Sequence, residues 1–579
     1  MMTPALVLVL IVARAVVLWD RPVEWTPTLI AACVGQDALA AVAFLAAETG
    51  LNRWRSGRRV IMAMFWIVVM YVAVNTAVAR VLPAPLTWPM LRAAGAPIAD
   101  SIRLHLTASS LGAIALVTGT AVVAVRLGRQ APASWAPMLA LSLLLVGVGG
   151  SVAAARVETW GLHRNALVTL VVSALPAVDA RAVAGDWRRP PFDASPSVDL
   201  SSLHGSAEGR NVVVIGLEST AAQYLRLYGA ADNVMPRLEE LAAHAVVFER
   251  TYAVSPDSIR SLWSVMCARS PAFDTDVEAY RAVPCGSVTD VLRARGYHTA
   301  LFHSGRFGYL GMNAVIRNRG FDTLEDAGHI GGNHESSFGV AEPATVARLL
   351  SWIDALHPTD RFLVSYMPVA GHHPYEVSGT GAFGFATDHD RYRSALHAGD
   401  AAIGVLVDGL TSRGLLEQTM FVVYGDHGQA FGQHPGNVGH SFYLYEENVR
   451  VPFFVAVPGA IAREVRSDIT ASLVDVVPTA FDLLGLPIDA RHQGESALGG
   501  QPRMALFFTD YGARLVGLRD GRWKFIHDLG TGRSQLFDLG QDPVEQRDRS
   551  RDEPARVAAY TQTLKAWSSA QKALLATGD

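Results

Sequence analysis

The stretch from Val422 to Gln429 (VVYGDHGQ) places a carboxylate beside an imidazole directly after an apolar run. The run has the composition of a β-strand, and a strand end holds side chains in fixed positions. Asp426 offers a hard oxygen ligand and His427 a borderline nitrogen ligand, a combination that suits a divalent metal ion. Gly428 lets the backbone turn away from such a site. An Asp-His pair alone is a weak signal, so further ligands must come from elsewhere in the chain.

A second carboxylate follows another predicted strand. Residues 211–217 (NVVVIGL) form a run rich in β-branched residues, which is typical of a parallel strand covered on both faces, and Glu218 comes next. Open α/β sheets place their sites at the carboxyl ends of the strands. We therefore expect Glu218 to converge with Asp426 and His427. Taken by itself, Glu218 would be interpreted as a solvated turn residue.

A candidate nucleophile lies between these two strands. Ser255 precedes Pro256, the pattern of a helix N-cap followed by proline at the first helical position, and predicts a helix from there toward Cys267. Capping is a sufficient structural explanation for this serine. The chemical alternative uses the same geometry, because a hydroxyl at a helix N-terminus lies where a phosphoryl or sulfuryl group would bind. A metal held by the two carboxylates and the imidazole would lower its pKa and activate it as a nucleophile.

The order of these motifs resembles the sulfatase branch of the alkaline phosphatase superfamily. It comprises a strand-ending acidic residue, then S-x-x-S-x-x-x-L-x-S from Ser255, H-x-P from His372 and D-H-G from Asp426. Two membrane-anchored types are similar in plan, the lipoteichoic-acid-synthase-like phosphoglycerol transferases and the lipid A phosphoethanolamine transferases. They combine about five spans with an exported catalytic domain. The resemblance extends from residue 211 to the C-terminus, and residues 292–326, 444–452 and 475–479 support it.

The resemblance implies roles for individual residues. Glu218, Asp426 and His427 match the family's metal ligands. Ser255 matches the residue that ligates the metal and is converted into the covalent intermediate. Two carboxylates, one imidazole and a serine suit a single divalent ion, zinc or manganese ahead of magnesium or calcium.

Histidines supply the substrate-side groups in this family. His372 in the segment GHHPY matches the histidine two positions before proline, and His373 competes for that assignment. His440, just before the segment LYEEN, matches a histidine that contacts substrate or a further metal, and His434 competes with it. Histidine titrates near neutrality, so it can orient a phosphate oxygen or protonate a leaving alkoxide. Lys524, on a predicted hairpin, is a further substrate-binding candidate, with a surface lysine as the alternative.

The departures from the family pattern bear on the reaction. Formylglycine sulfatases resemble C/S-x-P-S-R at the nucleophile, whereas Asp257 replaces that proline here and Ile259 replaces that arginine. We therefore expect an unmodified serine and a phosphoserine-type intermediate. Residues 521–525 (GRWKF) and 535–543 (QLFDLGQDP), in contrast, resemble the small C-terminal subdomain of sulfatases and of phosphonate or phosphodiester hydrolases.

These features favour a metal-dependent, membrane-anchored phosphotransferase. It would move a phosphoethanolamine- or phosphoglycerol-type headgroup from a phospholipid donor to a cell-envelope glycan or lipid. A membrane-tethered sulfatase or phosphodiester hydrolase is the first alternative. The second comes from another class, a non-catalytic envelope regulator that binds lipid. An aldehyde at Ser255 would support the sulfatase, and an unmodified or phosphorylated serine would not.

Composition divides the chain into a membrane part and a globular part. A length of 579 residues predicts two or three domains, and half of the residues are hydrophobic. The net charge of -4 and the pI near 6.5 argue against a nucleic-acid-binding protein. Most of the long apolar runs lie before about residue 155. Five of them approach the roughly 20 residues that cross a bilayer core: 5–19, 28–47, 60–78, 106–125 and 135–155.

Arginine placement predicts the orientation of these spans. The basic loops at residues 53–59 and 126–129 are expected in the cytoplasm, which places the N-terminus inside and everything after Ala155 outside. The first run is short but lacks a cleavage site of small residues, so we interpret it as a retained anchor. Arg14 and Asp37 lie within spans, where a lone charge is costly, and are candidates to pair. The sequence thus predicts a multi-pass protein of the bacterial inner membrane with a periplasmic or extracellular catalytic domain.

Four segments follow from these observations. Residues 1–160 are predicted to form a polytopic α-helical membrane domain and residues 161–205 a juxtamembrane helix and linker. Residues 206–500 are predicted to form a sulfatase/alkaline-phosphatase-like α/β domain with a mostly parallel central sheet. Residues 501–579 would form a small α+β subdomain with a hairpin and a terminal helix. Cys267 and Cys285 could pair in an oxidising compartment or remain buried thiols.

Overall fold

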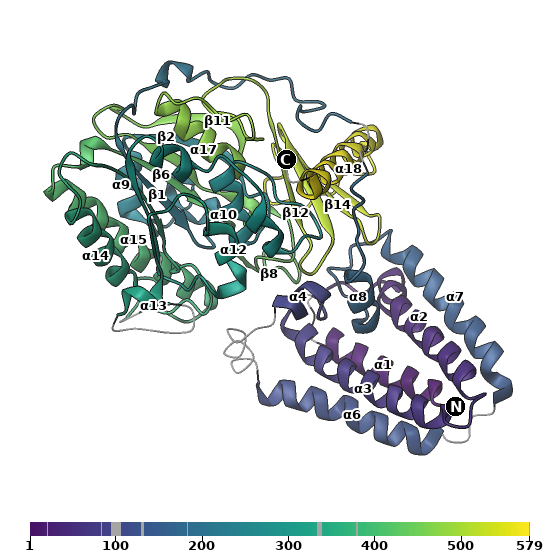
Figure 1. Cartoon of the computed structure of the whole chain (residues 1–579). Helices are drawn as coiled ribbons and strands as arrows, with labels where there is room; N and C mark the ends of the chain where they lie inside the picture. Colours follow the sequence, from purple (N-terminus) through teal and green to yellow (C-terminus); the bar gives the residue numbers. More distant parts are fainter. Residues whose placement is uncertain are drawn as a thin grey trace.

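The computed structural model describes residues 1–19, 21, 23–82, 84–93, 106–128, 133–181, 183, 185–332, 339–377 and 380–577. A bundle of helices from the N-terminal part lies beside a larger α/β body (Figure 1). The N-terminus is at the end of the bundle remote from that body.

A nine-stranded sheet forms the centre of the α/β body. Its strands are β1 (Asn211–Leu217), β2 (Ala245–Tyr252), β3 (Tyr297–His303), β4 (Thr323–Glu325), β5 (Arg361–Met367), β6 (Thr419–Gly425), β9 (Arg450–Val451), β10 (Phe453–Ala456) and β11 (Val465–Ser472). The order is β11-β2-β10-β6-β1-β5-β3-β4, with β9 paired to β2. Only β10 and β9 pair antiparallel to their neighbours. The mostly parallel sheet predicted from the sequence is confirmed.

Helices cover both faces of this sheet. One face packs against α9 (Pro236–Ala242), α14 (Glu342–Asp354) and α15 (Asp388–Ser412). The other packs against α10 (Ser258–Cys267), α11 (Val288–Arg293) and α17 (Val476–Leu483). No residue of β1 or β6 is exposed, as expected for central strands that lie between two helical layers. Shorter elements at the strand ends are α12 (Asn313–Ile316), α13 (Ala327–Ile330), α16 (Glu446–Val449), β7 (Ala430–Phe431) and β8 (Val438–Gly439).

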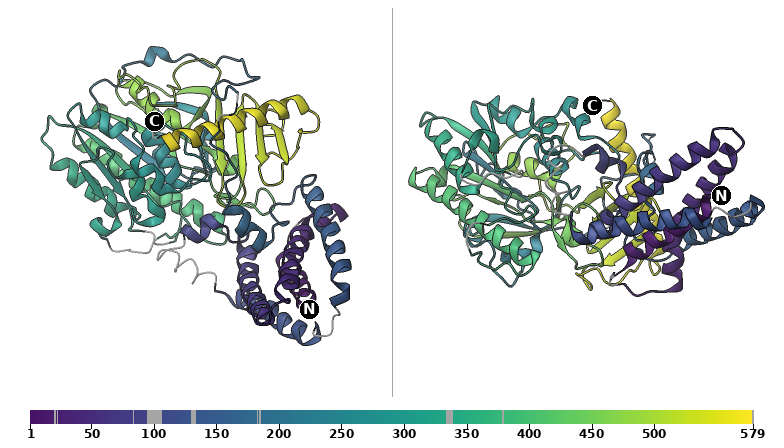
Figure 2. Two further views of the ribbon diagram at one scale, coloured as in Figure 1. Left: turned by 45° about the vertical axis from the view of Figure 1, so that its right-hand side comes forward. Right: turned by 90° about the horizontal axis from the view of Figure 1, so that it is seen from below.

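A second, antiparallel sheet forms the C-terminal part. It consists of β12 (Met504–Thr509), β13 (Leu515–Asp520), β14 (Trp523–Asp528) and β15 (Ser534–Asp538) in sequential order. The final helix α18 (Pro554–Thr577) lies across it (Figure 2). Tyr560, Leu564 and Trp567 of α18 are buried against the sheet, which confirms the prediction of a packing helix.

The structure also decides between the two alternatives for the cysteines. Cys267 at the end of α10 and Cys285 are joined by a disulfide, with their Cα atoms 5.3 Å apart. This bond ties α10 to the segment that precedes α11. Disulfides form and persist in oxidising compartments.

The N-terminal bundle has a helix at each of the five predicted stretches. These are α1 (Thr3–Leu18), α2 (Pro27–Leu51), α3 (Gly57–Val81), α6 (Ala108–Gly128) and α7 (Ala136–Ala154). All but α1 are long and apolar enough to cross a membrane, and α1 is a shorter apolar helix. Two short helices, α4 (Trp88–Ala93) and α8 (Ala166–Ser173), lie between the bundle and the α/β body.

The predicted pairing of Arg14 with Asp37 is confirmed. The guanidinium of Arg14 donates from Nε to Asp37 Oδ2 at 2.7 Å and from Nη2 to Oδ1 at 2.8 Å. Asn165 Nδ2 donates to the same carboxylate at 2.7 Å, and Arg14 also donates to the carbonyl of Leu162. The pair therefore joins α1 and α2 to the segment that leads into α8.

The α/β body contacts the bundle through loops on its lower edge in Figure 1. Tyr443 donates its hydroxyl to the carbonyl of Trp160 at 2.9 Å, and Arg164 donates to the carbonyl of Gly512, also at 2.9 Å. Thr87 donates to the carbonyl of Tyr511 at 2.7 Å. The membrane part is thus attached to both the main domain and the C-terminal sheet.

Candidate metal and active site

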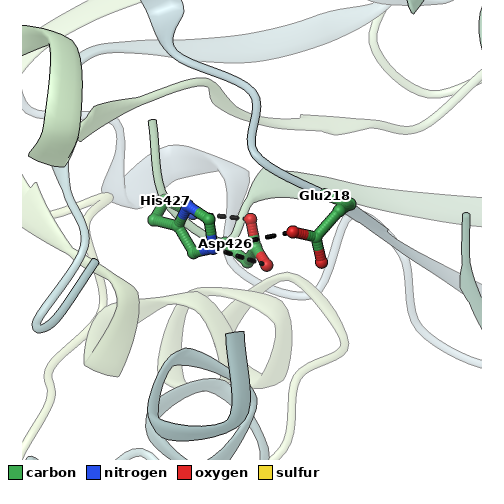
Figure 3. Close-up of side chains that lie close together, drawn as sticks. All are labelled: Glu218, Asp426 and His427. Atoms are coloured by element: carbon green, nitrogen blue, oxygen red, sulfur yellow. Dashed lines mark hydrogen bonds and ion pairs between the residues drawn. The ribbon is translucent and has the colours of Figure 1, made fainter. Parts of the chain in front are cut away.

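Strand register brings the two predicted carboxylates together. Strands β1 and β6 are parallel neighbours in which Leu217 is opposite Gly425, so Glu218 and Asp426 follow at the same level of the sheet edge. Figure 3 shows both side chains facing the ring of His427. Ligand atoms of the three residues lie within 4.8 Å of one another. The Nε2 atom of His427 is 3.6 Å from Glu218 Oε1 and 3.6 Å from Asp426 Oδ2.

Backbone amides fix the orientation of these carboxylates. Asp426 Oδ1 accepts hydrogen bonds from the amide of Ser219 at 2.8 Å and from the amide of His427 at 2.7 Å. The hydroxyl of Ser219 donates to Glu218 Oε1 at 2.8 Å. Ser219 has a φ of 52°, a left-handed conformation that is uncommon for a residue other than glycine and often occurs at functional sites. The turn after β1 is thus held in a strained form that points Glu218 at the site.

Gly428 has a different role from the one predicted. A Cβ atom at this position would lie 2.1 Å from the carbonyl oxygen of Glu447, so any larger residue would displace α16. The amide of Gly428 donates to the carbonyl of Asn448 at 2.8 Å. The glycine therefore permits close approach of the ligand-bearing loop to α16.

The helix that presents the hydroxyl begins later than the sequence suggested. Its first residue is Ser258 and its N-cap is Asp257, whose side chain accepts from the amide of Arg260 at 2.9 Å. The prediction that Ser255 is the N-cap is wrong. Ser255 instead lies in the preceding turn, where its carbonyl accepts from the hydroxyl of Ser261 at 3.0 Å and from the amide of Asp257 at 2.8 Å.

As a result, the serine beside the ligand cluster is Ser258. Its Oγ atom is 3.1 Å from Glu218 Oε2 and 3.1 Å from His427 Nε2. Among the described residues, the hydrogen bonds of Ser255 involve its carbonyl and none joins its hydroxyl to the cluster. The hydroxyl that lies next to Glu218 and His427 is thus that of Ser258, three residues after the serine predicted for this place.

The electrostatics of the cluster fit a divalent cation. Burial and the nearby charge of Glu218 raise the pKa of Asp426 well above its usual range. Burial acts in the same direction on Glu218, but the imidazoles of His427, His372 and His440 lower the pKa of its carboxyl to about 2. Two buried carboxyl groups this close cannot both ionise unless a cation joins them. Two carboxylates, one imidazole and one hydroxyl are a suitable ligand set for zinc or manganese.

His440 lies against the predicted ligand His427. The two rings are stacked with their centroids 4.1 Å apart, and Nδ1 of His440 donates to the carbonyl of Pro256 at 3.1 Å. Burial and the neighbouring His427 lower the pKa of His440 to about 3. The structure thus places His440 in the site, next to the turn that leads into α10.

Of the two adjacent histidines, His372 is the one near the cluster. It is among the groups that lower the pKa of Glu218, and the preceding Gly371 is so close that a Cβ atom there would lie 2.0 Å from the carbonyl oxygen of Glu218. Nδ1 of His372 donates to the carbonyl of His373 at 2.6 Å. His373 is exposed, with its ring packed edge-on against Tyr375.

The structure contradicts the substrate role predicted for Lys524 and the alternative of a surface lysine. Lys524 on β14 is fully buried, with Nζ 3.0 Å from Glu446 Oε1 and 2.9 Å from Glu545 Oε1. The structure likewise places His434 away from the ligand cluster. Its Nδ1 is 2.7 Å from Glu447 Oε1, and its ring stacks on Tyr445. Both residues belong to a separate buried group of charges between α16 and the C-terminal sheet.

One histidine at the site was absent from the predicted set. His303 is the last residue of β3, at the same sheet edge as Glu218, and its Nδ1 donates to the carbonyl of Met367 at 3.0 Å. Burial lowers its pKa, and the charge of Glu218 acts in the opposite direction. The available signal was its position as a polar residue at a strand end, the same signal that identified Glu218 and Asp426.

Together, the parallel sheet and the residues at its edge form an α/β domain with a candidate metal site. Residues 210–486 match the family model described as Sulfatase, and apolar helices precede the matched region. The predicted resemblance to this branch is confirmed.

Two curated relatives illustrate the range of similar proteins. The chain is 24% identical over 327 residues to lipoteichoic acid synthase 2 of Bacillus subtilis, covering 53% of this chain and 50% of that one. It is 31% identical over 157 residues to choline-sulfatase of Rhizobium meliloti, covering 25% of this chain and 30% of the relative. The chain therefore spans half or less of the length of these relatives.

Solved structures agree on the fold. A protein of the alkaline phosphatase superfamily from Vibrio parahaemolyticus superposes with a TM-score of 0.55 at 18% identity, covering 69% of this chain and 93% of that one. The lipoteichoic acid synthase LtaP from Listeria monocytogenes gives a TM-score of 0.52 at 18% identity, covering 65% and 96%.

Proposed function

We propose that this protein is a metal-dependent, membrane-anchored phosphotransferase that uses Ser258 as its nucleophile. It would take a phosphoethanolamine- or phosphoglycerol-type headgroup from a phospholipid and pass it to a glycan or lipid of the cell envelope. The observation that carries the proposal is the position of Ser258 Oγ, 3.1 Å from both Glu218 and His427 at the N-terminus of α10. The hydroxyl, the ligand set and the helix N-terminus converge where a phosphate ester would bind.

The residues of the site account for a two-step reaction. A divalent ion bound by Glu218, Asp426 and His427 would supply positive charge that favours the serine alkoxide and the anionic ester. In the first step the hydroxyl of Ser258 loses its proton and its oxygen forms a bond to phosphorus, the bond between phosphorus and the lipid alcohol breaks, and that alcohol takes up a proton. In the second step an acceptor hydroxyl loses its proton and attacks phosphorus, which releases Ser258. His372 and His440 are placed to orient phosphate oxygens or to exchange these protons.

The membrane part supports a lipid donor. Four helices are long and apolar enough to cross a bilayer, and the chain is similar to a lipoteichoic acid synthase over half of each protein. The amide of Met2 donates to the carboxylate of Glu48, so the N-terminus lies at the same end of the bundle as the basic loop after α2. This arrangement and the disulfide support an N-terminus in the cytoplasm and an exported catalytic domain.

A sulfatase is the second candidate, and the similarity to choline-sulfatase favours it. The motif argues against an aldehyde nucleophile even with the corrected register. Counted from Ser258, Arg260 replaces the proline of the formylglycine pattern and Leu262 replaces its arginine. An unmodified serine would instead form a phosphoserine-type intermediate.

The test combines turnover with detection of the intermediate. Full-length protein in vesicles would be given phosphatidylglycerol or phosphatidylethanolamine, and the release of diacylglycerol would be measured together with the mass of the peptide containing Ser258. We expect diacylglycerol release and a phospho-alcohol adduct on Ser258, both lost in Ser258→Ala.

Each other outcome selects a different function. An aldehyde at residue 258 together with sulfate release would identify a sulfatase. Unchanged cellular lipids and glycans in a Ser258→Ala strain, with no bound metal in the purified protein, would leave the non-catalytic lipid-binding regulator.

A further inference from the structure

A second site lies at the junction between the helical bundle and the α/β body. A cavity of about 60 Å³ is enclosed by α1, α3, the segment that precedes α8 and the loop at residues 435–436. One water requires roughly 10–15 Å³ by this measure, so the cavity holds several waters or one small polar group. Its charged and amide side chains are those of Arg14, Arg21, Asp37, Asn75, Arg164 and Asn165.

The charges in this cavity do not balance. Asp37 is the single carboxylate in the lining, and Arg14 already engages both of its oxygens. Arg21 donates to the carbonyls of Val17 and Ala79, at 3.3 and 2.6 Å, and Arg164 donates to the carbonyl of Gly512. Neither Arg21 nor Arg164 forms an ion pair within the part of the chain that the structure describes. Two arginines therefore line the cavity with no counter-anion among the residues that the structure describes, which favours an anionic ligand.

The remaining lining indicates what kind of anion fits. Leu10, Ala13 and Val17 of α1 and Val72 of α3 form the apolar side of the cavity. A guanidinium group can donate two parallel hydrogen bonds to phosphate oxygens, and apolar side chains next to it can contact the hydrocarbon part of a lipid. Arg21, Val23 and Trp160 are partly exposed, so a ligand can reach the cavity from outside the folded chain.

We propose that this junction cavity binds the phosphate of a phospholipid, at a site distinct from the metal cluster. Arg21 and Arg164 would hold the phosphate, and the acyl chains would leave the cavity past the partly exposed Val17 and Val23. On the other side the lipid headgroup meets Pro435 and Gly436, which lie in the loop that leads to His440. The proposal is independent of catalysis, because binding at this cavity can be measured with the nucleophile removed.

The test measures lipid binding by the full-length Ser258→Ala protein in a neutral, phosphate-free detergent. Native mass spectrometry would follow titrations with dioleoylphosphatidylglycerol and with diolein, which lacks phosphate. We expect saturable binding of the phospholipid, weaker binding of diolein, and at least a tenfold loss of phospholipid affinity in Arg21→Gln/Arg164→Gln. Arg21→Lys keeps the charge and should retain most of the affinity.

Arg80→Gln is the matched control. Arg80 lies near the end of α3, next to the lining residue Ala79. Its guanidinium contacts Ser109, and Arg80 does not line the cavity. Ala13→Leu provides a second variant, because it narrows the cavity without removing a charge and should also weaken binding. A thermal melt of each variant in the same detergent shows whether it is folded.

The outcomes separate the sources of the phosphate. Failure of millimolar inorganic phosphate to displace the phospholipid would support the lipid, whereas displacement at low millimolar concentration would overturn the lipid assignment in favour of free phosphate. Equal phospholipid affinity in the wild type, the double arginine variant and Ala13→Leu would overturn the proposal altogether.

Discussion

Two groups of buried charges lie near α16, and they differ in whether a lysine or arginine of the protein supplies a cation between the carboxylates. In the cluster at the sheet edge, Glu218 and Asp426 are accompanied by a histidine and a serine. In the second group, Glu446 and Glu545 are both within 3.0 Å of Lys524.

This difference distinguishes a ligand site from a structural one. The second group, called the lysine group below, contains its own cation, because the buried ammonium of Lys524 contacts both Glu446 of α16 and Glu545 of the C-terminal part. The edge cluster retains an excess of negative charge that raises the pKa of Asp426. Residue types alone do not separate the two groups, since both contain glutamate and both lie beside a histidine.

Removal of the nucleophile should have the largest effect. Ser258→Ala removes the hydroxyl that lies against Glu218 and His427, so we expect the rate of headgroup transfer to fall by about 10⁴-fold or more. Ser255→Ala is the matched control three residues earlier and should retain activity within about an order of magnitude. Initial rates on a fluorescent phospholipid would check both. A larger loss at Ser255 than at Ser258 would reverse the assignment.

The lysine group should reveal its role in stability. Lys524→Met leaves Glu446 and Glu545 buried without their cation, and we expect the free energy of unfolding to fall by about 3–5 kcal/mol. Lys565→Met makes the same chemical change at an exposed position of α18 and should change the free energy of unfolding by about 0.5 kcal/mol or less. Urea unfolding of the two variants makes the comparison. Equal stability would show that the lysine does not hold the C-terminal sheet in place.

The lysine group also predicts that the free energy of unfolding depends on pH. Burial raises the pKa of Glu545 to about 7, and Glu446 adds to the rise while Lys524 opposes it. A pKa above the unfolded value means that Glu545 favours the folded state when protonated, and this contribution is lost as the pH rises through 7. We expect roughly 2–3 kcal/mol less stability from this group at pH 8 than at pH 5, as derived from the shift in pKa.

Glu545→Gln should flatten this part of the pH profile in unfolding experiments. Glu208→Gln, at an exposed carboxylate, should leave the slope as in the wild type. The interpretation of the lysine group would fail if the slope between pH 5 and pH 8 were the same in all three proteins.

The smallest effect concerns the helix cap that positions Ser258. Asp257→Ala removes the acceptor for the amide of Arg260 and should lower the stability by about 1 kcal/mol, whereas Asp257→Asn keeps an acceptor and should change it by a few tenths. Thermal unfolding can resolve the two. An alanine variant as stable as the asparagine variant would mean that α10 begins independently of this cap.

The sequence predicted the fold and the convergence of Glu218, Asp426 and His427 because both depend on strand ends. Uninterrupted β-branched runs identified β1 and β6, and parallel pairing then required Glu218 and Asp426 to meet at one edge. The apolar stretches located the membrane helices for a similar reason, since length and hydropathy are local properties.

The sequence did not predict the first residue of α10 or the burial of Lys524, because neither follows from the pattern of a single strand. Ser255-Pro256 and Asp257-Ser258 both have the pattern of a helix start, and only the folded turn shows that Asp257 is the cap. Lys524 was expected on the surface or near substrate because its partners, Glu446 and Glu545, are distant in sequence. His434 is likewise held by a residue of this buried group, because its ring contacts the carboxylate of Glu447.

The most direct test of the comparison is the metal content of the purified full-length protein. We expect about one zinc or manganese ion per chain in the wild type and in Lys524→Met, and a loss of that ion in Asp426→Asn and His427→Ala. A wild type that contains no divalent ion, and whose unfolding temperature does not rise when zinc or manganese is added, would contradict a metal site at Glu218, Asp426 and His427.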